Sequence, residues 1–364
     1  MGTRLECTHL TKNIGSFALS DIHFSACSGE ITGIIGVNGS GKTTLVRTLI
    51  GTYRLREQDH GQIGLFHTDG EGREELLAQP DGGAGSREYK GRVCCVLTAT
   101  PYPLWMKCME IGELCGAYYQ DFDLAAYRDK LAEYGLTPEG QIQELSAGEQ
   151  MKQQLAFAMA RDAEVYILDE PAGNLDVDFR EVLYQEMRRL AYDRGCAVLY
   201  ATHLVQELEG LADRILWLDR QVLKEGDSQG TNTQKDGLSQ RRRKAWTNRK
   251  GGMVADKFME EDKARRERQE ARHIGIQKFW GSIDELRDAY RIVEGSGREL
   301  AQIPADMLVA KRIRDTNSEA FVRVGNGRLP EGLEAETRMA GLQEIMYYSC
   351  GGAEGTGWDY ADRE

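Results

Sequence analysis

A glycine-rich segment at residues 36–44 restricts this chain more than any other part of its sequence. An apolar run at residues 31–35 precedes it and a helix-like run at residues 42–49 follows it. The segment fits the pattern G-x-x-x-x-G-K-[ST] and reads Gly36-Val37-Asn38-Gly39-Ser40-Gly41-Lys42-Thr43-Thr44. Glycines keep side chains away, so that consecutive backbone N–H groups can point at one phosphate group. We therefore expect a strand, a phosphate-binding loop and a helix in this order.

The residue types in this loop predict which groups hold a nucleoside triphosphate. Lys42 is expected to reach the β- and γ-phosphate oxygens, and the Thr43 hydroxyl is expected to ligate Mg²⁺. The start of the following helix adds the positive end of its dipole. The remaining predicted contacts to the phosphates come from Gly36, Asn38, Gly39, Ser40, Gly41 and Thr44.

Length and composition limit the class of protein. A chain of 364 residues is long enough for two domains, or for one domain with an appendage. Its net charge of −12 and pI of about 5.2 argue against a general nucleic-acid binder. Residues 1–30 lack the features of a signal peptide, and no apolar run reaches about eighteen residues, so we expect no membrane span. The eight cysteines have no metal-binding spacing and are expected to be reduced.

The apolar pattern alternates between strands and helices. Strands are expected near residues 5–10, 17–24, 31–35, 61–66 and 93–97, with a surface loop at 69–91. Helical spacing follows at residues 108–119, 124–134 and 151–160. Ser146 and Glu149 form a capping-box pattern that places a helix start at Ser146. The fold class is therefore α/β.

Two later strands end in side chains suited to phosphate chemistry. The apolar run 165–168 leads into Asp169 and Glu170, and the run 197–201 leads into Thr202 and His203. Open α/β sheets bind ligands at the carboxyl ends of their strands. We expect Asp169 to bind Mg²⁺ directly or through a ligand of the ion, and Glu170 to polarise the attacking water. His203 is expected to hydrogen-bond toward the γ-phosphate and the water. Each residue alone could simply end a strand; the phosphate loop upstream favours the catalytic interpretation.

Taken together, these motifs resemble the ATP-binding subunit of an ABC transporter. The loop at 36–44 matches the Walker A motif, residues 145–150 (LSAGEQ) match the signature LSGGQ, and residues 165–170 match Walker B. Residues 174–176 match the D-loop, and His203 matches the switch histidine. The resemblance covers about residues 4–225. It implies a P-loop NTPase of ABC type, with a mixed sheet, an antiparallel β part and a helical subdomain at about residues 100–162.

The resemblance also implies ligands and partners. ATP and Mg²⁺ would lie between two ATP-binding subunits, identical or paralogous, arranged head to tail. Ser146 and Gly148 of one subunit would face the γ-phosphate held by Lys42 of the other, and Asp176 would join the nucleotide site. A separate membrane-spanning permease would form the transport path, which places this chain in the cytoplasm on the inner face of the membrane. No nucleic-acid partner is expected.

The resemblance alone indicates the direction of transport and whether the ATPase drives transport. Residues 119–123 and 145–161 are similar to the branch that energises exporters of drugs, antibiotics and lipids, so export is expected. The alternative is a non-transport ATPase or a nucleotide-gated module acting on soluble partners. A third interpretation, a nucleotide sensor without turnover, is disfavoured because Lys42, Asp169, Glu170 and His203 occur together.

Two positions depart from the family pattern. Ile14 stands where an aromatic side chain normally stacks on adenine; Phe17 could replace it, or the base could rest on apolar contacts alone. Thr98 stands where the Q-loop glutamine is expected and is too short to span the same distance. The first departure concerns base binding and the second concerns coupling to the permease.

The remainder of the chain changes in character. Residues 226–273 carry few large apolar side chains and many charges, including a basic cluster at 240–250, and predict a flexible linker with a solvated helix near 256–273. A solvated charge run explains the cluster best; contact with anionic lipid head groups is the alternative. Residues 274–350 predict a small α+β accessory domain, and residues 351–364 a frayed tail.

Overall fold

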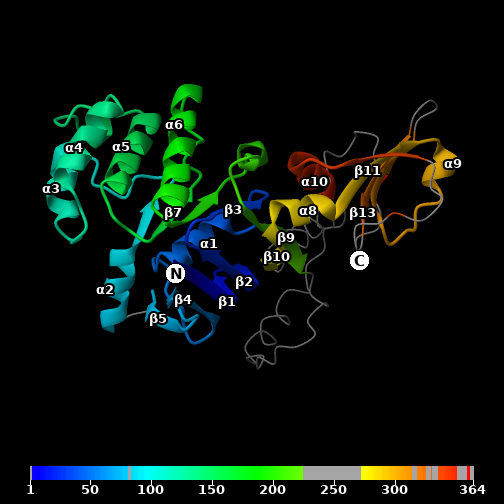
Figure 1. Cartoon of the computed structure of the whole chain (residues 1–364), viewed down its shortest axis with the longest axis horizontal. Coiled ribbons are helices and arrows are strands. Elements are labelled where there is room, and N and C mark those ends of the chain that lie inside the picture. The colour runs from blue at the N-terminus through cyan, green and yellow to red at the C-terminus, as the bar shows by residue number, and fades with distance from the viewer. Residues whose placement is uncertain are drawn as a thin grey trace, which may run out of the picture.

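Two β-sheets organise the computed structural model, which describes residues 2–80, 83–223, 272–313, 318–324, 329, 335–350 and 359–360 (Figure 1). The strands of the larger sheet are β1 (Gly2–Ile14), β2 (Phe17–Cys27), β3 (Ile31–Gly36), β4 (His60–Thr68), β5 (Glu74–Ala78), β6 (Val93–Val96), β7 (Val165–Asp169), β8 (Ala197–Ala201), β9 (Arg214–Leu223) and β10 (Arg272–Ser282). The helices accompanying it are α1 (Lys42–Leu49), α2 (Gly83–Arg92), α3 (Cys108–Gly116), α4 (Leu124–Glu133), α5 (Ala147–Met159) and α6 (Val177–Arg188), with the short helical turns η1 (Ile142–Glu144), η2 (Arg189–Asp193) and η3 (Val205–Leu208).

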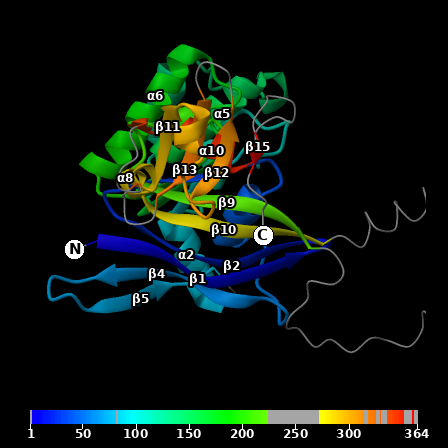
Figure 2. The same ribbon diagram turned by 90° about the vertical axis from the view of Figure 1, so that its right-hand side faces the viewer.

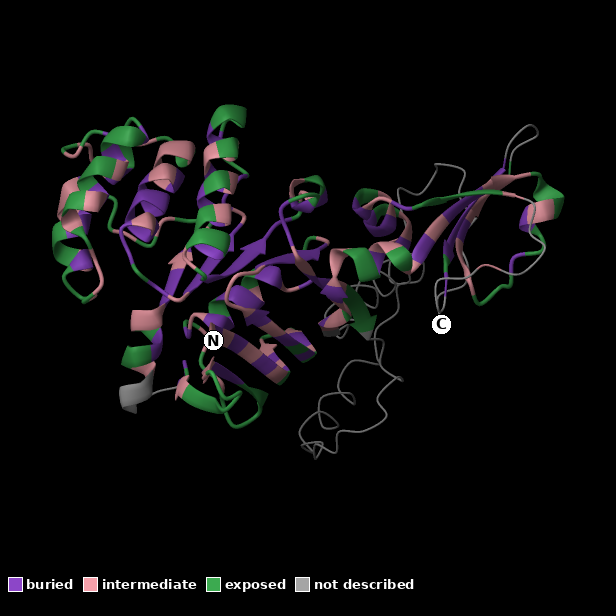
Figure 3. Ribbon diagram, viewed as in Figure 1, coloured by how far each residue is buried: buried purple, intermediate pink, exposed green. Residues whose placement is uncertain are grey.

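The larger sheet is mixed, as the sequence predicts. Its order is β5-β4-β1-β2-β10-β9-β3-β8-β7-β6. Strands β1, β2, β4 and β5 pair antiparallel, while β3, β6, β7 and β8 pair parallel. Every residue of β3, β7 and β8 is buried (Figure 3), which explains their continuous apolar sequences. Helices α3, α4 and α5 lie together at one end of the molecule (Figure 1).

Strand β10 differs most from the expectation. The predicted linker ended at residue 273 and a separate domain began at 274, but that boundary falls inside β10. This strand lies between β9, to which it is antiparallel, and β2, to which it is parallel (Figure 2). The charged residues before it hid the strand pattern of Ile274, Ile276 and Phe279. The basic cluster at 240–250 and most of the helix predicted near 256–273 lie outside the described residues.

Two further segments correct the sequence-based expectation. The predicted surface loop at 69–91 contains β5 and α2, and Tyr89 of α2 is fully buried, with its hydroxyl donating a hydrogen bond to the Leu49 carbonyl oxygen (2.7 Å). Its glycine and glutamate content obscured both elements. In the predicted frayed tail, Asp359–Tyr360 forms the short strand β15; the other residues of 351–364 lie outside the described part of the chain.

The second sheet belongs to a C-terminal unit, which we define as residues 283–350 together with β15. Its elements are α8 (Ile283–Asp288), β11 (Tyr290–Gly295), α9 (Gly297–Leu300), β12 (Leu308–Arg312), β13 (Ser318–Arg323), β14 (Glu336–Met339) and α10 (Leu342–Ser349). The strand order is β14-β11-β13-β12-β15, antiparallel throughout. The rings of Tyr290 and Phe321 stack in its core at 5.1 Å between centroids. Among the described residues, no helix combines the length and apolarity needed to cross a membrane.

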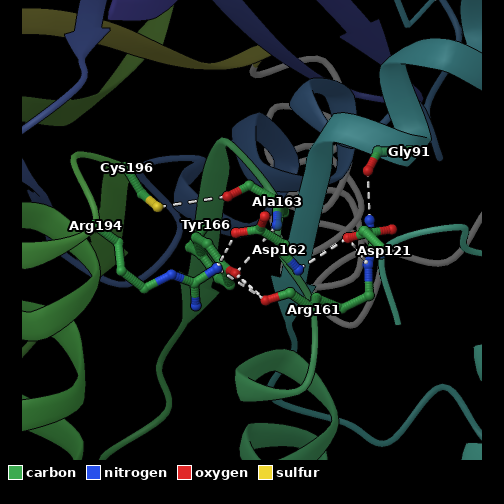
Figure 4. A network of polar contacts seen from close by, with 8 residues as sticks. All are labelled: Gly91, Asp121, Arg161, Asp162, Ala163, Tyr166, Arg194 and Cys196. Atoms are coloured by element: carbon green, nitrogen blue, oxygen red, sulfur yellow. Dashed lines mark hydrogen bonds and ion pairs between the residues drawn. The ribbon is translucent and has the colours of Figure 1, made fainter. Parts of the chain in front are cut away.

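A buried arginine joins the helical end of the molecule to the sheet (Figure 4). Arg161 follows α5, and its side chain is 1% exposed. Its Nε donates to Asp121 Oδ2 (2.7 Å), its Nη2 donates to the Gly91 carbonyl oxygen, and its guanidinium carbon lies 3.7 Å from the centre of the Tyr119 ring. A buried guanidinium needs such partners because it has lost its hydration. Asp121 therefore supports the joint between α3–α5 and the sheet.

We predict that Asp121→Ala lowers the free energy of unfolding by about 2–3 kcal/mol, because it leaves a buried charge without its carboxylate. Asp162→Ala is the matched control, since Asp162 pairs with Arg194 at the surface with its side chain 83% exposed. The control is expected to change stability by less than about 1 kcal/mol. Urea titrations followed by circular dichroism measure both variants. Equal effects would contradict this role of Asp121.

Candidate functional site

Most of the predicted phosphate loop meets Glu170 and His203 at one cleft. Gly36, Ser40 and Asp169 do not line the cleft and are buried beside it. Of the residues that the structure describes, thirteen line the cleft, from five separate parts of the chain: Phe17, Val37, Asn38, Gly39, Gly41, Lys42, Thr43, Thr44, Thr98, Glu170, Gly173, Asn174 and His203. The loop closes β3, Glu170 follows β7, and His203 follows β8. Parallel pairing of β3, β8 and β7 brings their carboxyl ends to the same edge of the sheet.

Close packing against strand β10 and the Phe17 ring holds the phosphate loop in place. A Cβ on Gly275 of β10 would lie 2.2 Å from the Ser40 carbonyl oxygen, so only glycine lets the strand approach the loop. Gly41, which begins α1, has a φ of 102°, and a Cβ there would lie 2.8 Å from the Phe17 ring. The loop therefore has its shape before any ligand arrives, which suits a phosphate cradle.

Lys42 is the buried cation of the cleft. Its Nζ donates to the Gly36 carbonyl oxygen (2.8 Å) and lies 3.6 Å from Glu170 Oε1. Burial lowers the pKa of Lys42, whereas the charge of Glu170 acts in the opposite direction. Because this ammonium group has little hydration, a phosphate oxygen beside it would stabilise its charge strongly.

The oxygen atoms of Asp169 and Thr43 fit a magnesium ion. Asp169 is 2% exposed, and burial raises the pKa of its carboxyl group, against the effect of the Thr43 hydroxyl. Thr43 Oγ1 donates to Asp169 Oδ1 across 3.5 Å, and Thr98 Oγ1 donates to the Asp169 backbone carbonyl oxygen (3.0 Å). Mg²⁺ prefers hard oxygen ligands and is usually held by one or two protein groups together with substrate phosphates. A buried carboxylate beside a hydroxyl provides that donor set.

Glu170 and His203 form a coupled pair at the cleft. Glu170 has a φ of 51°, which is a strained conformation for a residue with a side chain, and its N–H donates to the Ala201 carbonyl oxygen (2.8 Å). Its Oε2 lies 2.5 Å from His203 Nδ1 and also accepts a hydrogen bond from the His203 backbone N–H (3.3 Å). Strain of this kind is concentrated at functional sites. This backbone conformation places Glu170 Oε1 3.6 Å from Lys42 Nζ.

Ser146, Gly148 and Asp176 do not line this cleft. Ser146 begins α5 with the predicted capping box: its Oγ accepts from the Glu149 N–H (3.3 Å), and its own N–H donates to Glu149 Oε2 (2.8 Å). Ser146 is exposed, so the start of α5 faces outward. A Cβ on Gly148 would lie 2.6 Å from the Asn174 carbonyl oxygen. Asp176 accepts from the Phe179 N–H (2.8 Å) at the start of α6.

The two departures from the family pattern have different outcomes. Ile14 does not line the cleft; it borders a neighbouring hollow with Tyr53 and Arg54, whereas Phe17 does line the cleft. Thr98 lies at the cleft beside Asp169. Gly173 and Asn174 also line the cleft. No sequence motif indicates Gly173, and only the D-loop match indicates Asn174; the position of both residues just after Glu170 was the available signal.

A phosphate loop at the carboxyl edge of a mixed sheet, facing an acidic strand end, defines a P-loop nucleoside triphosphatase. The model of the family described as ABC transporter matches residues 19–173. The zinc import ATP-binding protein ZnuC of Pseudomonas fluorescens (strain Pf0-1) is 30% identical over 211 residues, which is 57% of this chain and 70% of that protein. The chain therefore belongs to the ABC transporter family, and it is an ATPase that binds ATP.

Other relatives agree with this assignment. The ribose import ATP-binding protein RbsA of Hahella chejuensis is 30% identical over 237 residues, which is 63% of this chain but only 44% of that protein. A solved structure described as the ATP binding subunit of an ABC transporter shares the fold, with a TM-score of 0.50 and 23% identity over 58% of this chain and 85% of that one. Both named relatives are import proteins, which is at odds with the predicted exporter branch.

We predict that Gly275→Ala weakens ATP binding at least about tenfold, because the added methyl group displaces the backbone at Ser40, and each 1.4 kcal/mol changes affinity tenfold. Gly91→Ala is the control, since a Cβ at Gly91 meets no atom within 4 Å. Isothermal titration with ATP measures both dissociation constants. An unchanged affinity for Gly275→Ala would contradict the support of the loop by β10.

Proposed function

We propose that this chain is the motor subunit of an ABC transporter, and that it binds and hydrolyses ATP with Mg²⁺ to drive a separate membrane-spanning permease. The observation that carries the proposal is the convergence of Lys42, Thr43, Glu170 and His203 on one preformed cleft, with Asp169 buried beside Thr43. Binding to the permease would hold the chain at the inner face of the membrane.

Each residue at the cleft has a distinct role in this proposal. The loop amides and Lys42 bind the β- and γ-phosphates, and Phe17 contacts the base. Thr43 and Asp169 would hold Mg²⁺, which neutralises charge on the β- and γ-phosphate oxygens when bound. Glu170 orients the attacking water and accepts its proton. His203 holds the Glu170 carboxylate in place and donates toward the γ-phosphate.

The outward-facing start of α5 supports a head-to-tail dimer. Ser146 and Ala147 at the start of α5 are exposed, and the positive end of a helix dipole attracts a phosphate anion, but in its own chain Ser146 does not line the cleft. In the dimer, Ser146 and Gly148 of one subunit complete the γ-phosphate site at Lys42 of the other. Asp176, at the start of α6, joins the same interface.

The helical end of the molecule offers a surface for the permease. Four large apolar side chains are exposed there: Leu104 (52%), Trp105 (67%), Leu114 (58%) and Tyr118 (82%). Exposed apolar groups of this kind mark interaction sites. Export remains a prediction from the sequence, and the import named for the relatives speaks against it. Transport into or out of sealed vesicles containing the permease decides the direction.

We predict that Phe17→Ala weakens ATP binding about five- to tenfold more than it weakens inorganic triphosphate binding, because stacking on the base, about 1 kcal/mol or more, is lost for ATP alone, whereas the packing of the ring beside Gly41 is lost for both ligands. Ile14→Ala is the control and is expected to stay within about twofold of the wild type for both ligands. Competition titrations with a fluorescent nucleotide compare them. If Ile14→Ala weakened ATP binding more than Phe17→Ala, the base would lie in the neighbouring hollow that Ile14 borders.

We predict that Glu170→Gln binds ATP with unchanged affinity, loses ATP turnover by at least about a hundredfold and accumulates as a dimer, because only the proton acceptor is altered. Gel filtration with light scattering in ATP and Mg²⁺ measures the dimer. Lys42→Ala, which cannot grip the phosphates, serves as the monomeric control. A monomer for Glu170→Gln with ATP bound would count against the proposed dimer.

A further inference from the structure

The C-terminal unit packs directly on the segment that follows His203. That segment is η3, which begins two residues after the histidine. Val205 and Leu208 of η3 are buried in the same apolar cluster as Leu342, Ile345 and Met346 of α10. Figure 1 shows α10 and α8 on the side of the C-terminal unit that faces the larger sheet. The contact between η3 and α10 is therefore made by buried core side chains.

Polar contacts fasten the same junction. Glu209 Oε1 accepts a hydrogen bond from the Leu342 N–H (2.9 Å), at the first residue of α10, and lies 3.5 Å from Arg287 Nη2 of α8. A carboxylate at a helix start is stabilised by the helix dipole. Gln206 Nε2 also donates to Gln343 Oε1 (2.6 Å). Glu209 thus contacts two helices of the C-terminal unit at once.

A second group of hydrogen bonds connects η3 to the histidine loop. Glu207 of η3 accepts from the Tyr200 hydroxyl at the end of β8 and from Thr202 Oγ1 (3.2 Å). Thr202 Oγ1 in turn accepts from the Leu204 N–H (2.9 Å), which shapes the turn around His203. A displacement of η3 must therefore move the backbone that aims His203 at Glu170.

We propose that the C-terminal unit positions His203 for ATP hydrolysis, with Glu209 as the positioning residue that fastens α10 to η3. The proposal rests on the role of His203 in the proposed function. Neither η3 nor α10 contributes a residue to the cleft, whereas His203 does. Loosening the junction is thus expected to slow the chemical step and to leave ATP binding at the loop intact. Any partner that moved the C-terminal unit would change turnover through this junction.

Steady-state ATPase measurements on the full-length protein test the proposal. Glu209→Ala is expected to lower kcat about three- to tenfold, in the range seen for positions that couple two sites, with the KM for ATP within about twofold. Glu344→Ala is the matched control. Glu344 caps α10 through the Gly341 N–H (2.9 Å) and pairs with Arg338, and both of these partners belong to the C-terminal unit. The control is expected to lower thermal stability but not kcat.

A double-mutant cycle separates positioning from general loss of stability. Gln206→Ala and Gln343→Ala remove the two partners of one hydrogen bond across the junction. If that bond helps to position the loop, the decrease in kcat of the double variant is no larger than the decrease in either single variant. Fully additive losses, equal kcat losses for Glu209→Ala and Glu344→Ala, or an unchanged kcat for Glu209→Ala would each overturn the proposal.

Hydrogen exchange gives a test that does not depend on activity. Glu209→Ala is expected to increase amide exchange at residues 202–208 at least about tenfold, with residues 36–44 unchanged. If the wild-type protein showed no ATP turnover, the proposed function would fail, while this measurement would still report on the junction. Unchanged exchange at residues 202–208 would overturn the junction itself.

Discussion

The contact between the phosphate loop and the strands beneath it is the constraint on which the site depends. A Cβ on Gly36 would lie 2.4 Å from the Leu218 carbonyl oxygen of β9, and Gly275 of β10 leaves even less room at Ser40. Because no side chain fits between these backbones, the loop is held in one shape by the sheet. Lys42 is then buried beside Glu170, where both charged groups are poorly hydrated. A phosphate oxygen would give the Lys42 ammonium group a second charged partner in place of water.

The sequence predicted the parts of this site that depend on short motifs. Local chemistry determines a glycine-rich loop after a strand, a capping box at Ser146 and carboxylates at the end of an apolar strand, so neighbouring residues suffice to recognise them. The helices over residues 108–159 also followed from apolar spacing, whereas the mixed sheet was expected only from the resemblance to ABC transporter ATP-binding subunits. The predicted roles of these residues in nucleotide binding remain proposals.

The sequence did not predict features that depend on contacts between distant residues. Strand β10 pairs with β2, more than 250 positions earlier in the chain, and no local pattern reports such a pairing. Gly275 of β10 even weakens the strand signal, although close packing on the loop requires it. The sequence offered Phe17 only as one alternative to Ile14, because its position at the cleft depends on how the β1–β2 turn packs near Gly41. The same limit hid the contact of Glu209 with α10.

We propose above all that the exposed helix start of a second subunit completes the ATP-binding site in the cleft. A structure of the protein with Mg²⁺ and a non-hydrolysable ATP analogue tests it most directly. The account predicts two chains arranged head to tail, with Ser146 of one chain within hydrogen-bond distance of the γ-phosphate bound at Lys42 of the other. A triphosphate bound at Lys42 with Ser146 of every chain facing solvent would contradict it.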